Sequence, residues 1–137
     1  MRILGMVFFL LTVLPAGCAF CQSNGHGQPV SICGNGLSCE DAKGMEVRAL
    51  DGDGEAAIEL FWDASDNDRK DDALFWAQIA MENGNSAGRH NYAVLLMEKG
   101  DLRSLMRARF HLKILVAQGD KDSGVLLSDV EKKLRGQ

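Results

Sequence analysis

Apolar runs in the second half of the chain are closed at intervals by a glycine and reopened by a small polar residue. These junctions are Gly84-Asn85, Gly100-Asp101 and Gly119-Asp120, separated by 16 and then 19 residues. Glycine just past a helix end adopts the left-handed conformation that satisfies the last carbonyl groups. Asn or Asp directly after it caps the free N–H groups of the next helix. The pattern therefore predicts consecutive helices, two for every 35 residues.

The stretch from Asp72 to Gly119 contains this helical unit twice. A shift of 35 residues places Ala73 on Ala108 and Gly84 on Gly119 without a gap. A helix-turn-helix unit of this length is typical of tetratricopeptide-like solenoids, in which each pair buries its apolar face by stacking on the next. We therefore predict an all-α fold, a short right-handed α-solenoid of antiparallel helix pairs with about two and a half repeats. An ordinary helical bundle without true repeats is the alternative.

The last two predicted helices differ in their polar faces. Residues 102–117 carry apolar packing positions that include Leu105, Met106 and Phe110. Arg103 with Arg107 and Arg109 with Lys113 lie four residues apart, so each pair is adjacent on the helix surface. The final helix has a narrow apolar stripe of Val125, Leu126, Val130 and Leu134, which is typical of a terminal capping helix.

Upstream of the repeats, the helical spacing of apolar residues is less regular. Residues 20–43 are rich in glycine, serine and asparagine, and we predict a loop there. A short helical turn around Val47 and Leu50 is followed by Gly52-Asp53, which repeats the junction motif, and by a predicted helix over 55–64. The charged stretch from Asp63 to Asp72 predicts an exposed loop between helices.

The first residues have the regions of a secretory signal peptide. Met1 and Arg2 precede an apolar run over 3–14, which ends in small residues around Ala19 and is too short to span a bilayer. Cleavage near Ala19 and lipoprotein processing with acylation of Cys18 both fit this pattern. The predicted organisation is a signal peptide over 1–19, a glycine- and cysteine-rich segment over 20–44 and a helical repeat domain over 45–137. We expect the mature protein in the periplasm.

All four cysteines lie within the first 39 residues. In an oxidising compartment, Cys33 and Cys39 are the pair we expect to form a disulfide, since the intervening Gly-Asn-Gly-Leu-Ser closes a small flexible loop. A disulfide that includes Cys21 and leaves one of the other two cysteines unpaired is one alternative. A zinc site from Cys21, His26, Cys33 and Cys39 is another, but these spacings match no common zinc finger. We therefore predict no metal and no other cofactor.

Composition is that of a globular protein, with 46% apolar and 25% charged residues, but charge is unevenly divided. Residues 40–72 contain twelve acids and four bases, a balance of minus eight. Residues 73–137 contain seven acids and ten bases, a balance of plus three. Because the overall balance is negative and no aromatic residues interleave the arginines, this asymmetry favours a charged protein partner over nucleic acid. Hydrated like-charged faces are the alternative interpretation.

Residues that carry enzyme chemistry are sparse. The three histidines, His26, His90 and His111, fall in one loop and two different helices. The sequence contains no nucleophile-elbow motif, no phosphate-binding loop and no pair of helical histidines at metal spacing. We therefore predict that the protein is not an enzyme.

The segment ALFWAQIAMENGNSAGRHNYAVLLMEKG resembles the repeats of the Sel-one-like family. That family's unit has small residues and an aromatic at fixed spacing, matched here by Ala73, Trp76, Ala80, Gly84 and, at the fourth small position, Ala87. The second copy keeps Ala108 and Gly119 but has His111 at the aromatic position and Asp122 at the small position. The second copy is therefore degenerate.

The resemblance implies a protein-binding role. Small exported bacterial proteins with such repeats are similar to immunity proteins that neutralise toxic effectors, including phospholipases, delivered by type VI secretion. On this basis we expect partner contacts from Arg89, His90, Arg103 and Arg107. The alternatives are an envelope scaffold, lipid-anchored at Cys18, and a small hydrolase, since some cysteine-rich relatives of the family act on β-lactams. The cysteines of those relatives bridge helix pairs, whereas these repeats contain none.

Overall fold

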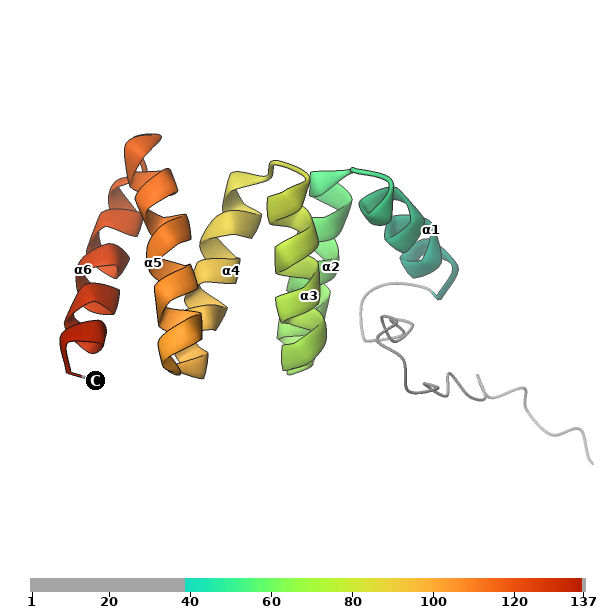
Figure 1. The fold of residues 1–137 in the computed structure, drawn as a ribbon. Coiled ribbons are helices and arrows are strands. Elements are labelled where there is room, and N and C mark those ends of the chain that lie inside the picture. The colour runs from blue at the N-terminus through green and yellow to red at the C-terminus, as the bar shows by residue number, and fades with distance from the viewer. Residues whose placement is uncertain (1–38, 137) are drawn as a thin grey trace, which may run out of the picture.

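The computed structural model describes residues 39–136, and this part of the chain contains helices and no strand (Figure 1). The helices are α1 (Cys39–Leu50), α2 (Gly54–Asp66), α3 (Lys70–Glu82), α4 (Ser86–Lys99), α5 (Leu102–Ala117) and α6 (Lys121–Arg135). Each helix runs antiparallel to the one before it and packs against it. The predicted all-α solenoid is confirmed.

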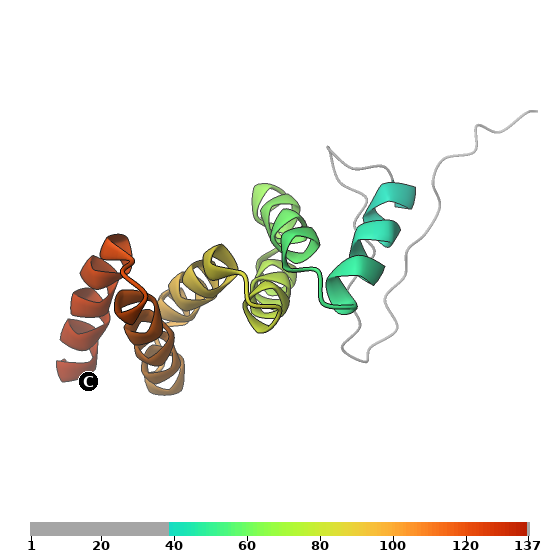
Figure 2. The ribbon, with the colours of Figure 1, turned by 90° about the horizontal axis from the view of Figure 1, so that it is seen from above.

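The helices form two layers along the array. Beyond the contacts between consecutive helices, α4 touches both α2 and α6, and α1 touches α3. Within residues 39–136, α3 and α5 make no such contact with each other. Seen from above, α2 and α3 lie on opposite sides of the array (Figure 2). The six helices amount to three pairs where about two and a half were predicted, and the right-handed superhelix stays a prediction.

Four of the five connections follow the predicted glycine junction. A glycine with positive φ lies one or two residues past the end of each of these helices, and the next residue is the N-cap of the following helix. At Gly84, φ is 84° and the Asn85 side chain accepts a hydrogen bond from the Gly88 amide at 2.8 Å. The other junctions are Gly52-Asp53, Gly100-Asp101 and Gly119-Asp120.

The connection between α2 and α3 is built differently. Asp68 takes the left-handed conformation, with φ of 52°, and the N-cap Arg69 makes no side-chain capping bond. Instead the Arg69 guanidinium pairs with Asp63 at the end of α2 and with Asp72 in the first turn of α3, the latter at 3.1 Å. The predicted loop from Asp63 to Asp72 is therefore wrong, because α2 continues to Asp66 and α3 begins at Lys70.

The start of α1 also differs from the prediction. Residues 39–43 are helical, although the sequence pattern placed them in a loop that ended at Lys43. Glu40 and Asp41 lie in the first turn of this helix, where negative charge is favourable. The predicted signal peptide, Cys18 and Cys33 lie outside the described residues, as does the side chain of Cys39.

Small residues set the spacing between α3 and α4. Ala73, Ala77 and Ala80 are buried beside the fully buried Trp76, as the alanine stripe predicted. The small residue of α4 that meets this stripe is Gly88, whereas Ala87 is exposed. The predicted position of the fourth small residue is therefore wrong by one.

The same offset applies in the second copy. Ser123 lies 35 residues after Gly88 and is fully buried, whereas Asp122 is exposed. His111 lies 35 residues after Trp76 and is also buried. The second copy therefore keeps a small buried residue and a ring at the corresponding positions, and it is less degenerate than the sequence indicated.

Candidate functional site

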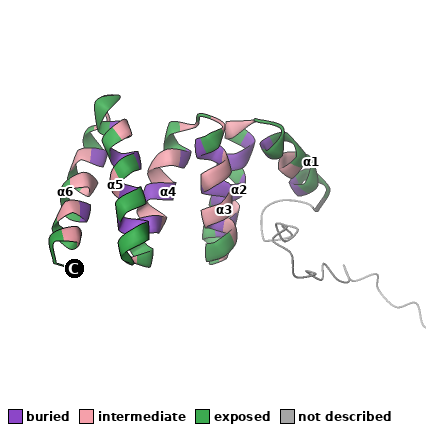
Figure 3. Ribbon diagram, viewed as in Figure 1, coloured by how far each residue is buried: buried purple, intermediate pink, exposed green. Residues whose placement is uncertain are grey.

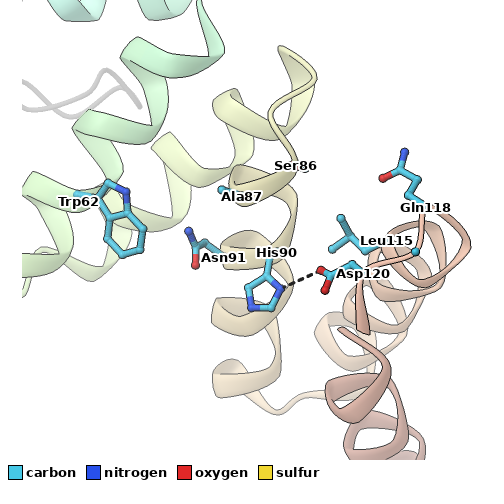
Figure 4. Close-up of a pocket in the computed structure, with 9 residues that line it drawn as sticks. Trp62, Ser86, Ala87, His90, Asn91, Leu115, Gln118 and Asp120 are labelled. Atoms are coloured by element: carbon cyan, nitrogen blue, oxygen red, sulfur yellow. Dashed lines mark ion pairs between the residues drawn. The ribbon is translucent and has the colours of Figure 1, made fainter. Parts of the chain in front are cut away.

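A surface hollow of about 630 Å³ lies between α2, α4 and the connection from α5 to α6. Trp62 of α2 forms one side, and its side chain is 47% exposed. Asn91 and His90 of α4 lie across from it, with Asp120 beyond them (Figure 4). The remaining lining residues are Ser86, Ala87, Leu115, Gln118 and Gly119.

His90 lies beside a serine and an aspartate at one end of this hollow. Its Nδ1 atom is 3.2 Å from Ser123 Oγ and 3.6 Å from Asp120 Oδ2. Ser123 Oγ donates a hydrogen bond of 2.7 Å to Asp120 Oδ2, and the other carboxylate oxygen accepts from the Ser123 amide at 3.3 Å. The Ser123 hydroxyl and amide bonds hold the pKa of Asp120 below its usual value.

This arrangement is explained by helix capping. Asp120 is the N-cap of α6, and its carboxylate satisfies N–H groups that have no partner within the helix. A nucleophilic serine needs a neighbouring base and access to the substrate. Ser123 is fully buried and its hydroxyl is committed to the carboxylate, so the three residues join α4 to the start of α6.

His111 lies apart from His90. Its ring is buried and meets the Tyr92 ring edge to face, with centroids 5.4 Å apart. Residues 90 and 92 of α4 differ by two positions, so their side chains lie about 200° apart around the helix axis. Burial lowers the pKa of His111, and the nearby Arg89 and Arg107 guanidinium groups lower it further. The structure therefore does not gather the two histidines into one site.

A second surface lies on the outer side of α5, opposite its buried residues. Leu102, Met106 and Phe110, spaced four residues apart, are 58%, 46% and 60% exposed. The predicted packing roles of Met106 and Phe110 are therefore wrong, as is that of Val125 on α6, which is 67% exposed. The reason is that α5 packs through an arc on its other side, formed by Leu105, Ala108, His111, Leu112 and Leu115.

Basic side chains surround this apolar stripe. Together, Leu102, Met106, Phe110, Arg103, Arg107, Arg109 and Lys113 are called the α5 face below. Residues 102–117 contain no acid, and within residues 39–136 none of these four cations lies within 4.0 Å of a carboxylate. The Arg107 guanidinium carbon lies 5.4 Å from the centre of the Tyr92 ring. Positive charge and apolar surface are thus both available to a partner, and Figure 3 marks the exposed positions of α5 in green.

An acidic counterpart lies on α2. Glu55, Glu59, Trp62 and Asp66 occur at spacings of four, three and four, so they share one side of the helix, and all four are exposed. This set is called the α2 face below. No salt bridge forms at its acids within residues 39–136, although Glu55 accepts a hydrogen bond of 2.9 Å from the Asn85 amide. This surface was not predicted from the sequence, although its acids occur there at helical spacing.

The predicted partner-contacting residues fall in different places. Arg103 and Arg107 belong to the α5 face, and Arg89 lies near His111 at the contact between α4 and α5. His90 lines the hollow on the other side of α4. The three arginines therefore lie toward the α5 side of the molecule, and His90 lies apart from them.

Comparisons of the chain with protein-family models, curated proteins and solved structures gave no match. The resemblance to Sel-one-like repeats therefore stays a prediction. Among the helices of residues 39–136, none combines the length and apolar character that crossing a bilayer requires.

Proposed function

We propose that this protein is a non-catalytic protein-binding repeat module of the bacterial envelope, an immunity or inhibitor protein that neutralises a toxic effector such as a phospholipase. The observation that supports this proposal is the α5 face. Exposed apolar side chains grouped on one surface mark binding sites more often than isolated ones do. Here three of them share one side of a single helix with four cations that lack carboxylate partners.

The chemistry of the α5 face indicates the kind of partner surface it fits. Leu102, Met106 and Phe110 would supply apolar area at the centre of a contact, where most binding energy arises. Arg103 and Arg107 would meet carboxylates of the partner, which raises the association rate and selects against basic surfaces. An acidic surface with an apolar groove is therefore the expected complement on the effector.

Co-expression with the product of a neighbouring toxin gene tests the proposal. We expect the wild-type chain to restore growth and to co-purify with the toxin. The double substitution Arg103→Glu with Arg107→Glu should abolish both effects. Lys121→Glu with Lys132→Glu on α6 makes the same change in net charge and should leave them intact. Failure of the wild-type chain to protect against any adjacent gene product would sink the proposal.

Export and the absence of catalysis are parts of the same proposal. Cell fractionation should find the protein in the periplasm, and the mass of its mature N-terminus should show cleavage near Ala19. An acylated Cys18 would instead support the anchored scaffold. The burial of Ser123 beside His90 supports a non-catalytic protein. Turnover of a hydrolytic substrate that disappears in His90→Ala would contradict that part.

A further inference from the structure

The α2 face and the α5 face have matching dimensions. The α2 face runs from Glu55 to Asp66 and the α5 face from Leu102 to Lys113, so each spans twelve residues and eleven residue-to-residue steps. At the rise of an α-helix, both stripes are about 16 Å long. Two straight helices of equal contact length can lie side by side over their full stripes, so the geometry permits one face to cover the other.

Their charges are opposite. The α2 face carries three acids, Glu55, Glu59 and Asp66, and the α5 face carries four cations. Within residues 39–136, neither set is neutralised by a salt bridge. Attraction between exposed charges is weak for each pair and is screened by salt. A row of such pairs along two helices nevertheless orients the approach and disfavours contact between two identical faces.

Their apolar groups are also complementary. Trp62 is the exposed aromatic residue of the α2 face, and it forms one side of the hollow of about 630 Å³. Phe110 is the most exposed of the three large apolar side chains on the α5 face. A side chain of that size at the edge of the hollow would bury its ring against the indole, in an edge-to-face or offset arrangement. The hollow thus offers a receiving site for an apolar group of the α5 face.

We propose that the α5 face of one copy of this chain docks on the α2 face of a second copy. This inference goes beyond the proposed function and does not depend on it. The two faces belong to different layers of the array. Within residues 39–136, α2 lies in the layer in which α2 contacts α4 and α4 contacts α6, whereas α5 packs on α4 and α6 from the other layer and makes no contact with α3. The contact is therefore heterologous, so association continues head to tail into open chains and does not stop at a closed dimer.

Sedimentation equilibrium of the purified protein tests the proposal. The weight-average mass should rise steadily with protein concentration at about 50 mM salt and fall toward that of the monomer at about 500 mM, because screening weakens exposed charge pairs. Phe110→Ser should weaken association at least tenfold with no change in helical circular dichroism. A monomer at every concentration in low salt would overturn the proposal.

Charge-swap variants identify the surfaces. Arg103→Glu with Arg107→Glu removes the positive balance of the α5 face, since two acids then stand beside Arg109 and Lys113. Glu59→Lys with Asp66→Lys reverses two of the three charges of the α2 face. We expect each double variant to be monomeric alone and an equimolar mixture of the two to associate, since the unchanged α5 face of one variant then meets the unchanged α2 face of the other. The control pair Lys121→Glu with Lys132→Glu should associate like the wild type. A mixture that stays monomeric, or a control that loses association, would contradict docking between these two faces.

Discussion

Gly88 of α4 lies directly against Ala80 of α3. A β-carbon built on Gly88 would come within 2.4 Å of the Ala80 β-carbon and 2.9 Å of its carbonyl carbon. Real β-carbons do not approach so closely, so the distance between the two helices depends on this glycine. Ser123, at the corresponding position 35 residues later, is a small residue that is fully buried near the start of α6.

Replacing Gly88 tests that dependence. Gly88→Ala should lower the free energy of unfolding by about 1–3 kcal/mol, because the added methyl group forces α3 and α4 apart. Gly124→Ala is the matched control, since a β-carbon there meets nothing within 4 Å and lies inside α6. It should stabilise the protein by up to about 1 kcal/mol. Urea denaturation of both variants measures the difference, and equal effects would contradict the role assigned to Gly88.

The aspartate caps predict sensitivity to acid. Hydrogen bonds from the Ser104 hydroxyl and amide lower the pKa of Asp101, and capping bonds likewise lower the pKa of Asp53 and Asp120. A carboxylate whose pKa is lower in the folded state stabilises the fold above its unfolded pKa of about 3.9. That contribution is lost as the pH falls through the lower, folded value.

Asn is as good an N-cap as Asp but does not titrate in this range. Asp101→Asn with Asp120→Asn should therefore have a Tm near that of the wild type only at the lowest pH, below the lowered folded pKa of the two wild-type carboxylates. From that pH up to about pH 5 its Tm should rise less with pH than that of the wild type, because only the wild type gains ionised caps in this interval. Thermal melts from pH 7 to pH 2.5 measure both slopes. Parallel curves would show that the caps do not control acid stability.

His111 gives a second pH dependence at higher pH. Because burial and the charges of Arg89 and Arg107 lower its pKa in the folded state, the unfolded chain binds the proton more readily. Stability should therefore decline as the pH falls below about 6.5, the usual value for histidine. His111→Phe should remove this decline between about pH 6.5 and 5, because the replacement does not titrate. An unchanged slope in that interval would assign it to another group.

His111→Phe should have a second effect, on the free energy of unfolding, because it removes a buried polar atom. The Nδ1 atom of His111 is buried and has no hydrogen-bond partner within residues 39–136. An apolar ring of similar shape needs no partner, so the variant should be no less stable than the wild type at pH 7.5. The corresponding residue Trp76 shows that a large ring is accepted at this repeat position. Denaturant unfolding at pH 7.5 checks this expectation.

Arg69 should be needed for the connection between α2 and α3. Arg69→Ala leaves the largely buried Asp63 side chain without its ion-pair partner and should lower the free energy of unfolding by about 1–3 kcal/mol. Arg69→Lys keeps the charge but lacks the planar fork that reaches Asp63 and Asp72 together. It should recover only part of the loss. Full recovery by lysine would show that charge alone suffices.

The sequence predicted the fold best where local chemistry determines it. Glycine followed by Asn or Asp correctly marked four connections, because a left-handed residue and a capping side chain are both local requirements. The fifth was missed because Asp68 adopts the left-handed conformation and Arg69 is held by ion pairs to both flanking helices. Charged residues there indicated a long loop, although Asp66, Lys70 and Asp71 lie at exposed positions within the two helices.

Exposure was harder to predict than helicity. Met106 and Phe110 are apolar and occur in a strongly apolar helix, so the sequence assigned them to the core. Which side of α5 is buried depends on where α4 and α6 lie. The positions of these two helices cannot be predicted from the local sequence of α5. The basic pairs of α5 were correctly predicted to be on its surface, but the apolar stripe beside them needed the structure.

The absence of contact between α3 and α5 bears on how this molecule can evolve. Each helix is stabilised by its neighbours along the array. Within residues 39–136 the first and last helices do not contact each other, so the number of units is not fixed by closure of the array. Duplication or deletion of one 35-residue unit would lengthen or shorten the array while its other junctions stayed intact. Such a chain can change its reach by whole units, without redesign of the core.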